Sequence, residues 1–359
     1  MADEKTSSKT MPENKEDVAA VAKWGQTYKE LAAEISKVIV GQTNVIEQMI
    51  VAILARGHAL LEGVPGVGKT LMVLSASKAM NLSFSRVQFT PDLMPSDITG
   101  TDVLQEDPIT HEHSYKFMEG PIFANIVLAD EINRTPPKTQ AAMLEAMQER
   151  MISAGGENYK LPSPFFVLAT QNPLGQEGTY PLPEAQRDRF LLHIRVDYPS
   201  GLEEWEIADK VTTGTLGDVN QVLDGADIIE AQNIVLRMPV CDQVVGYALQ
   251  LVRASRPGTS PWSRTEAGGD APESITQWIN WGAGPRGVLT LISCAKARAL
   301  IHGRYHASVD DINWVIGPSL RHRIGPNYAA LAAGVTSEEI IDMLMKEVPA
   351  SKEYAAPVA

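Results

Sequence analysis

A glycine-rich segment followed by lysine and threonine is the part of this chain best suited to chemistry. Residues 63–70 read Gly-Val-Pro-Gly-Val-Gly-Lys-Thr, which fits G-x-x-x-x-G-K-[ST] at every fixed position, between a predicted strand and a predicted helix. Glycines let backbone N–H groups surround phosphate oxygens, and the start of a helix adds positive dipole character. The lysine would reach the β- and γ-phosphates, and the threonine hydroxyl would bind Mg²⁺. The residues expected to contact a nucleoside triphosphate here are Gly63, Val64, Pro65, Gly66, Val67, Gly68, Lys69, Thr70 and Leu71.

Two acidic residues and an asparagine follow apolar runs further along the chain. Asp130 and Glu131 come directly after the run at 126–129, and Asn172 follows the run at 165–170. The carboxyl ends of parallel strands lie at one edge of a sheet, where ligands collect. Beside a phosphate loop, Asp130 would hold Mg²⁺, Glu131 would deprotonate the attacking water and Asn172 would position that water. The structural alternatives are a helix cap formed by the acidic pair and a turn formed by the asparagine before a proline.

The elements that must position these motifs are strands alternating with helices. Continuous apolar runs, typical of strands buried on both faces, lie at 58–62, 126–129, 165–170 and 191–196, and 84–89 is another strand candidate. Helical spacing of apolar residues occurs at 42–56 and 69–80. The alternation predicts an α/β fold with a parallel sheet between helices. Two interruptions, near 101–123 and 152–164, carry turn residues and alternating patterns and predict hairpin insertions.

The character of the chain changes after about residue 200. From there, helical patterns dominate, at 228–238, 240–254, 285–302, 309–316 and 337–348. The first residues are polar and charged with almost no apolar side chain, which indicates a flexible tail. The predicted organisation is therefore a tail at 1–18, an α/β core at 19–200, a linker at 201–225, a smaller all-α domain at 226–348 and a flexible C-terminus at 349–359.

The composition narrows the classes of partner. The chain has 359 residues and a formal net charge of −13, and this negative charge argues against a protein that binds nucleic-acid phosphates over a broad part of its surface. Its two cysteines, Cys241 and Cys294, are far apart and lack metal-type spacing, so we expect buried thiols in a reducing compartment. No stretch approaches the about 18 apolar residues of a membrane helix, and the N-terminus has no apolar signal segment. We therefore expect a cytoplasmic protein without a membrane span.

Several longer stretches resemble the MoxR group of AAA+ ATPases, in the clade with an insertion in helix 2. The approach to the phosphate loop, Gly-His-Ala-Leu-Leu-Glu-Gly at 57–63, carries part of the resemblance. So do Leu-Ala-Asp-Glu-Ile-Asn-Arg-Thr-Pro-Pro-Lys-Thr-Gln at 128–140 and the segment 169–190, which begins Ala-Thr-Gln-Asn-Pro and ends Asp-Arg-Phe. Shorter matches follow at 282–286 and 303–306. The resemblance implies an AAA+ core with a helical lid domain and covers roughly residues 35–348.

The resemblance also assigns residues that pattern alone leaves open. By pattern, Arg187, Arg189 and Arg286 could each form a surface salt bridge or compensate charge on a phosphoryl group. The resemblance implies that Arg189 is an arginine finger, that Arg286 is sensor 2 and that Asn172 is sensor 1. Arg187 stands where the family more often has leucine. The residues that the resemblance places near the adenine are Val40, Gly41 and Gln42.

The function that the resemblance implies is ATP hydrolysis with Mg²⁺, coupled to remodelling, maturation or activation of a protein complex or metalloenzyme. Family members typically form hexameric rings, and many work with von Willebrand factor A-domain proteins. The alternative is a nucleic-acid-associated AAA+ motor or loader. The phosphate loop alone does not separate the two, but the acidic net charge favours a protein client over nucleic acid.

Overall fold

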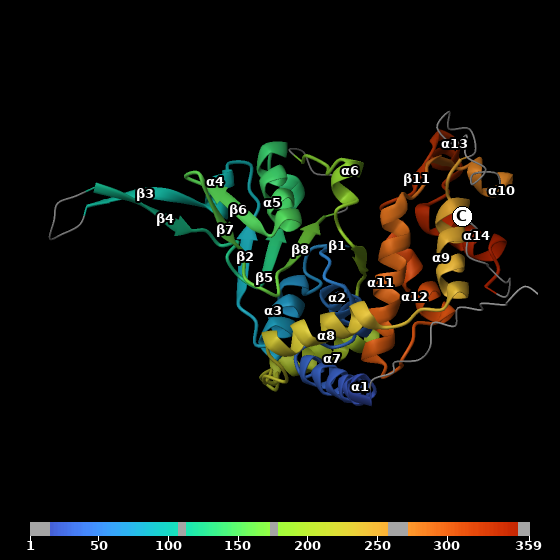
Figure 1. Ribbon diagram of the computed structural model, residues 1–359, viewed down its shortest axis with the longest axis horizontal. Helices are drawn as coiled ribbons and strands as arrows, with labels where there is room; N and C mark the ends of the chain where they lie inside the picture. Colours follow the sequence, from blue (N-terminus) through green and yellow to red (C-terminus); the bar gives the residue numbers. More distant parts are fainter. Residues whose placement is uncertain (1–14, 107–112, 173–178, 258–271, 351–359) are drawn as a thin grey trace, which may run out of the picture. The chain divides into compact units, whose positions relative to one another are not determined.

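The computed structural model describes residues 15–106, 113–172, 179–257 and 272–350. It divides into two compact units (Figure 1). One unit consists of residues 30–229 and holds the large sheet. The other consists of the described residues within 1–29 and 230–359 and is mainly helical.

The core of residues 30–229 is a five-stranded parallel sheet, as the apolar runs predict (Figure 1). Its strands are β1 (Ala59–Gly63), β2 (Phe84–Gln88), β5 (Ile126–Asp130), β8 (Phe166–Gln171) and β9 (Leu192–Val196). They lie in the order β2-β5-β8-β1-β9, and every neighbouring pair is parallel. The sheet is therefore an open one whose strands end at a common edge, where the phosphate loop leaves β1.

Helices cover both faces of this sheet. They include α2 (Thr43–Leu54), α3 (Lys69–Ala79) and α5 (Pro137–Glu149). The β1–α3–β2 crossover and the β5–α5–β8 crossover run in opposite directions along the sheet, so right-handed connections place α3 and α5 on opposite faces. Under α5, one buried apolar cluster joins alternate residues of the strands to the helix: Leu60, Val87, Ala129, Ala169, Met143, Leu144 and Met147.

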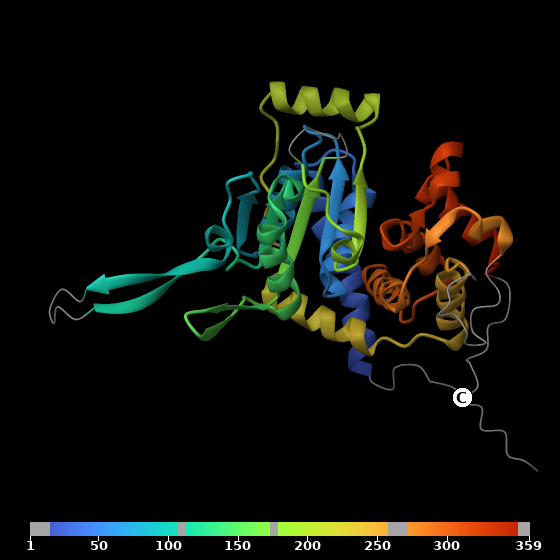
Figure 2. The ribbon, with the colours of Figure 1, turned by 90° about the horizontal axis from the view of Figure 1, so that it is seen from above.

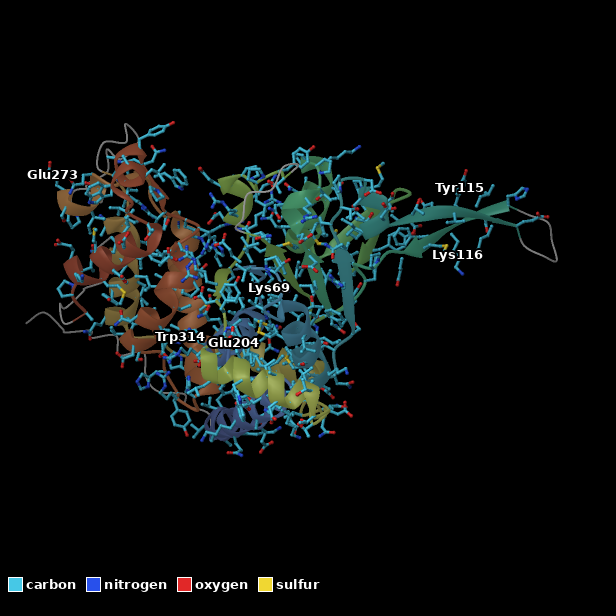
Figure 3. The ribbon with its side chains drawn as sticks, turned by 180° about the vertical axis from the view of Figure 1, so that it is seen from behind. Lys69, Tyr115, Lys116, Glu204, Glu273 and Trp314 are labelled. Carbon is cyan, nitrogen blue, oxygen red and sulfur yellow. The ribbon has the colours of Figure 1, made fainter. Side chains whose placement is uncertain are left out.

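Both predicted insertions are hairpins. The first pairs β3 (Gly100–Glu106) with β4 (His113–Glu119), after the short helix α4 (Pro95–Thr99). It projects away from the sheet (Figure 2) and carries Tyr115 and Lys116 on its outer part (Figure 3). The second hairpin pairs β6 (Met151–Ala154) with β7 (Glu157–Lys160). Phe117 of β4 stacks on Tyr159 of β7 with ring centroids 4.1 Å apart, so the two hairpins brace each other.

Two segments differ from the predicted boundaries. Helix α1 (Lys15–Ser36) begins inside the segment expected to be a tail. Its buried stripe, which contains Trp24, starts at Val21, and the turns before it form a helix because their residues are mostly good helix formers. Helix α7 (Gly201–Thr212) occupies the first half of the expected linker and belongs to the unit with the sheet. A capping box at Ser200 starts this helix.

The second unit contains the helical domain expected near the C-terminus. Its helices are α8 (Gly225–Arg237, which crosses from the first unit), α9 (Asp242–Ala254), α10 (Glu273–Thr276), α11 (Pro285–Ile301), α12 (Val309–Leu320), α13 (Tyr328–Ala333) and α14 (Ser337–Glu347). It is not purely helical, since β10 (Ile279–Trp281) pairs with β11 (Gly325–Pro326). Within the described parts of the chain, no helix combines the length and apolar character needed to cross a bilayer.

A buried ion-pair cluster fixes two helices of this unit. Asp311, in the first turn of α12, has a fully buried side chain. It accepts hydrogen bonds from Arg298 Nη1 at 2.9 Å and Arg304 Nη1 at 2.6 Å, and from the backbone N–H of Ser308 at 2.9 Å. The Arg298 guanidinium lies 4.8 Å above the Trp314 ring. Although burial raises the pKa of Asp311, these hydrogen bonds outweigh it and leave the pKa below its usual value.

Candidate functional site

The glycine-rich segment forms a loop between the end of β1 and the start of α3. Gly66 and Gly68 both adopt left-handed backbone conformations, with φ of 88° and 78°. A β-carbon at either position would meet no atom within 4 Å, so the backbone angle, rather than crowding by neighbours, favours glycine. Lys69 folds back over the loop, and its Nζ donates to the carbonyl oxygens of Gly63 and Val64. The loop thus surrounds an open concave space with backbone.

The residues predicted to act on phosphates line one cavity of about 410 Å³ next to this loop. Burial lowers the pKa of Lys69, and the nearby carboxylates Asp130 and Glu131 oppose that shift. The cavity also contains residues to which the sequence assigned no role. Its lining residues are Pro65, Gly66, Gly68, Lys69, Thr70, Leu71, Arg86, Asp130, Glu131, Thr170, Gln171 and Asn172.

Thr170, on β8, contacts both acidic residues at the end of β5, through the carboxylate of Asp130 and the backbone of Glu131. Its Oγ1 donates to Asp130 Oδ1 at 2.6 Å and accepts from the backbone N–H of Glu131 at 2.8 Å. Glu131 has a left-handed backbone (φ 58°), unusual for a residue with a β-carbon. Its carboxylate accepts from Gln88 Nε2 at 3.1 Å and is paired with Arg134 Nε at 2.9 Å. Both carboxylates are therefore fixed by hydrogen bonds rather than free to rotate.

A second set of polar contacts lies at the ends of β1, β8 and β9. Glu62, directly before the loop, accepts from Gln171 Nε2 at 3.0 Å and is paired with His193 Nε2 at 3.1 Å. The hydrogen bond from His193 is the main reason that the pKa of Glu62 falls to about 2. Its negative charge acts on Lys69 and favours the protonated amine. Because Gln171 precedes Asn172, this network also anchors the end of β8.

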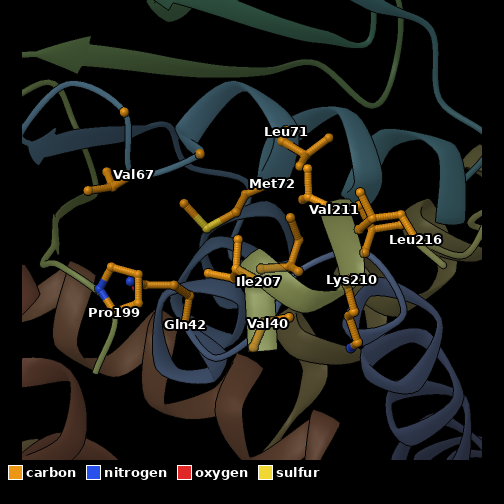
Figure 4. Close-up of a pocket in the computed structure, with 14 residues that line it drawn as sticks. Val40, Gln42, Val67, Leu71, Met72, Pro199, Ile207, Lys210, Val211 and Leu216 are labelled. Atoms are coloured by element: carbon orange, nitrogen blue, oxygen red, sulfur yellow. The ribbon is translucent and has the colours of Figure 1, made fainter. Parts of the chain in front are cut away.

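An apolar pocket of about 240 Å³ adjoins the loop on its other side (Figure 4). The side chains of Val40, Met72 and Ile207 point into it, from the segment before α2 and from α3 and α7. Gln42 lines it as well, and its Nε2 donates to the Asp197 carbonyl at 2.9 Å. A side chain at Gly41 would be strained, since φ is 66°, and its β-carbon would displace the Glu203 carboxylate, whose Oε1 lies 2.1 Å from that position. An apolar slot beside a phosphate cavity suits a planar base.

The donor set of the two cavities fits ATP and Mg²⁺. Thr70 and Asp130 bring a hydroxyl and a carboxylate into the same cavity, and hard oxygen ligands are those that Mg²⁺ prefers. Lys69 and the loop amides supply positive charge for phosphates, and the apolar pocket supplies a place for the base. One chain thus offers a contiguous surface for base, phosphates and metal.

The predicted residues that do not line these two cavities are Gly41, Gly63, Val64, Arg189 and Arg286. Arg189 precedes β9, so it lies toward the N-terminal ends of the parallel strands, where its Nη1 donates to the Leu144 carbonyl at 3.3 Å. The phosphate loop leaves the opposite end of β1, a strand of five residues that spans about 16 Å. Arg286 belongs to the other unit, in the first turn of α11.

Sequence reasoning missed Thr170, Arg86 and Gln88 as members of the site. The signal for the last two was present, because Arg86 and Gln88 alternate with Val87 and Phe89 in a predicted strand and so share one face. What the sequence did not reveal is the order of the strands, which places β2 next to β5.

Comparisons with known proteins agree with this geometry. Residues 58–192 match the ATPase family associated with various cellular activities (AAA), and residues 274–344 match the AAA lid domain. The chain is 41% identical to the chaperone MoxR1 of Mycobacterium tuberculosis over 92% of this chain and 84% of that protein. It is 30% identical to the protein MoxR of Methylorubrum extorquens, over 92% of this chain and 97% of that one. A crystal structure of a protein described as an ATPase, from Cytophaga hutchinsonii, superposes with a TM-score of 0.84 at 37% identity, covering 94% of this chain and 99% of that chain.

Proposed function

The chain belongs to the MoxR family of AAA+ ATPases, and from that premise we propose that it couples Mg²⁺-dependent ATP hydrolysis to the remodelling of a protein client. The observation that carries this proposal is the single cavity that contains Lys69, Thr70, Asp130, Glu131 and Asn172. These are the groups that phosphoryl transfer to water requires: cations for the phosphates, oxygens for a metal, a base and a positioning amide.

The roles follow from the chemistry of each group. Thr70 and Asp130 would hold Mg²⁺, which when bound neutralises charge on the phosphate oxygens. Glu131 would take a proton from the water that attacks the γ-phosphorus, while the bond from that phosphorus to the ADP oxygen breaks. Asn172 would orient the water, and Lys69 would balance the negative charge on the phosphates.

The distance of Arg189 from the loop of its own chain supports a role in a neighbouring subunit. We propose that subunits form a hexameric ring in which Arg189 reaches the adjoining nucleotide, with Arg286 of the lid as sensor 2. Hydrolysis would then require assembly, so the ATPase rate per subunit should rise with protein concentration. Wild-type turnover by an Arg189→Ala variant that still assembles would contradict the role in trans.

A protein client is supported by the naming of a close relative as a chaperone. It is supported also by the first hairpin, on which Leu104 and Tyr115 face each other across the strands and are 52% and 78% exposed. Apolar side chains so displayed on a projecting hairpin suit contact with a polypeptide. We propose a cytoplasmic protein complex or metalloenzyme as the client, and a von Willebrand factor A-domain protein as the partner.

The decisive experiment uses Glu131→Gln. This variant should bind ATP with wild-type affinity but hydrolyse it at least about 100-fold more slowly, because the base is missing. Affinity capture with the variant in ATP should retain the client, and Lys69→Ala, which loses the phosphate contact, should not. Undiminished turnover of Glu131→Gln would remove its role as base, and identical captures by both variants would contradict nucleotide-dependent remodelling.

A further inference from the structure

The two carboxylates of the site are tied to side chains of the neighbouring strand β2. Arg86 donates twice to Asp130 Oδ2, from Nε at 3.0 Å and from Nη2 at 2.6 Å. The same Nη2 donates to Gln88 Oε1 at 2.8 Å, and Gln88 Nε2 donates to Glu131 Oε2 at 3.1 Å. A continuous chain of hydrogen bonds therefore runs from Asp130 through Arg86 and Gln88 to Glu131.

These hydrogen bonds use most of the lone pairs on the Asp130 carboxylate oxygens. Oδ2 has two lone pairs, and Arg86 meets both of them with two N–H groups. Oδ1 accepts from Thr170, which leaves it one lone pair. Magnesium sites use carboxylate oxygens of this kind, so Arg86 and a metal draw on the same group.

The exposure of the two side chains indicates which of them can move. Asp130 is 13% exposed and is held from the inside by Thr170, whereas Arg86 is 48% exposed. Arg86 also lies on β2, at the edge of the sheet, and lines the phosphate cavity. Its guanidinium can therefore leave Asp130 without disturbing the core, and it would remain close to the phosphates when it does.

We propose that Arg86 is a positioning residue that couples the metal-binding carboxylate of Asp130 to the water-activating carboxylate of Glu131. In the structure it neutralises Asp130 and, through Gln88, is linked to Glu131. A metal held by Oδ2 of Asp130 would compete with the guanidinium, and Arg86 would then be available to the phosphates and no longer tied to Asp130. The proposal deepens the magnesium-dependent hydrolysis proposed above and depends on it.

The test measures binding in addition to turnover, using a fluorescent ATP analogue and the variant Arg86→Ala. Without Mg²⁺, the variant should bind the analogue about tenfold more weakly, because a cation has been removed from the phosphate cavity. With the analogue bound, half-saturation by Mg²⁺ should need about tenfold less metal, because Asp130 has lost its competing cation. A purely structural ion pair would not move the two affinities in opposite directions.

Two further variants separate the parts of the chain of hydrogen bonds. Arg134→Ala removes an arginine that pairs with Glu131 rather than Asp130, so it should leave the Mg²⁺ half-saturation at the wild-type value. Gln88→Ala should lower turnover about tenfold while also leaving Mg²⁺ half-saturation unchanged, because it breaks the link to Glu131 but keeps both hydrogen bonds from Arg86 to Asp130. Arg86→Gln serves as a second neutral variant, and the melting temperature of each variant verifies folding.

The outcomes distinguish this proposal from the function on which it rests. An unshifted Mg²⁺ half-saturation in folded Arg86→Ala and Arg86→Gln, with a wild-type protein that needs Mg²⁺, overturns the role of Arg86 alone. A wild-type protein that hydrolyses ATP equally well without any divalent cation overturns the metal-dependent function itself. Opposite shifts of the two affinities support both.

Discussion

The buried histidine at the start of β1 makes stability depend on pH. His58 is 6% exposed, its Nδ1 accepts from the backbone N–H of Val167 at 3.0 Å, and its Nε2 lies 2.9 Å from the Met147 carbonyl. The acceptor role of Nδ1 places the single proton on Nε2, which donates to that carbonyl, so the native state needs the neutral ring. Burial is the main cause that lowers the pKa of His58 from 6.5 to about 4, with the charge of Arg150 adding to it.

The sign and size of the effect follow from this shift. In the unfolded chain His58 takes up a proton below pH 6.5, whereas in the native state it does so only near pH 4. Lowering the pH through this window therefore favours the unfolded state, and the free energy of unfolding falls by about 3 kcal/mol in total. Between pH 7 and pH 5 the expected loss due to this residue is about 2 kcal/mol.

The assay compares urea unfolding of the wild type and of His58→Gln at pH 7 and pH 5. The variant is expected to be less stable at pH 7, because glutamine cannot replace both hydrogen bonds, but to lose about 2 kcal/mol less on acidification. His113→Gln, at an exposed position on β4, is the matched control and should follow the wild type. Equal losses in the wild type and His58→Gln would refute the reasoning.

Three further predictions concern the other unit and the two cavities. Asp311→Ala should lower the free energy of unfolding by about 3–5 kcal/mol, because two arginines lose the buried carboxylate that pairs with them. The control is Asp310→Ala at the neighbouring exposed position, which should change the free energy of unfolding little when both variants are compared by thermal unfolding. Thr170→Val should reduce the steady-state ATPase rate about tenfold at unchanged nucleotide affinity, since Asp130 loses the hydrogen bond that fixes it. A wild-type rate would count against this role of Thr170. Ile207→Trp should weaken ATP binding about tenfold in a fluorescence titration by filling the apolar pocket, and unaltered affinity would mean that the base binds elsewhere.

Local patterns in the sequence predicted much of the fold because they are set by neighbours along the chain. The apolar runs that became β1, β5 and β8 are buried on both faces, which leaves a signal that needs no knowledge of the partner strand. The phosphate loop is similar, since its glycines and lysine act within eight consecutive residues. Both hairpins were predicted for the same reason.

The missing parts of the site depend on contacts that are distant in sequence. Arg86 meets Asp130 across 44 positions, and Thr170 meets it across 40. Only the strand order β2-β5-β8 brings the three together, and that order is a property of the whole sheet. Residues 201–225 were expected to be a linker, and helix α7 within them has no buried residue, yet Ile207 and Val211 on one side of it line the apolar pocket.

The backbone conformation of Glu131 opposes the stability of the fold to the rate of ATP turnover. Its φ of 58° costs an L-residue with a β-carbon about 1 kcal/mol or more, a cost that glycine largely avoids and asparagine reduces. A chain selected only for a stable fold would drift toward one of those residues at this position, and it would lose the carboxylate proposed to activate water. Glutamate at position 131 therefore costs the fold some stability, and a substitution there that relieves the backbone strain would lower activity.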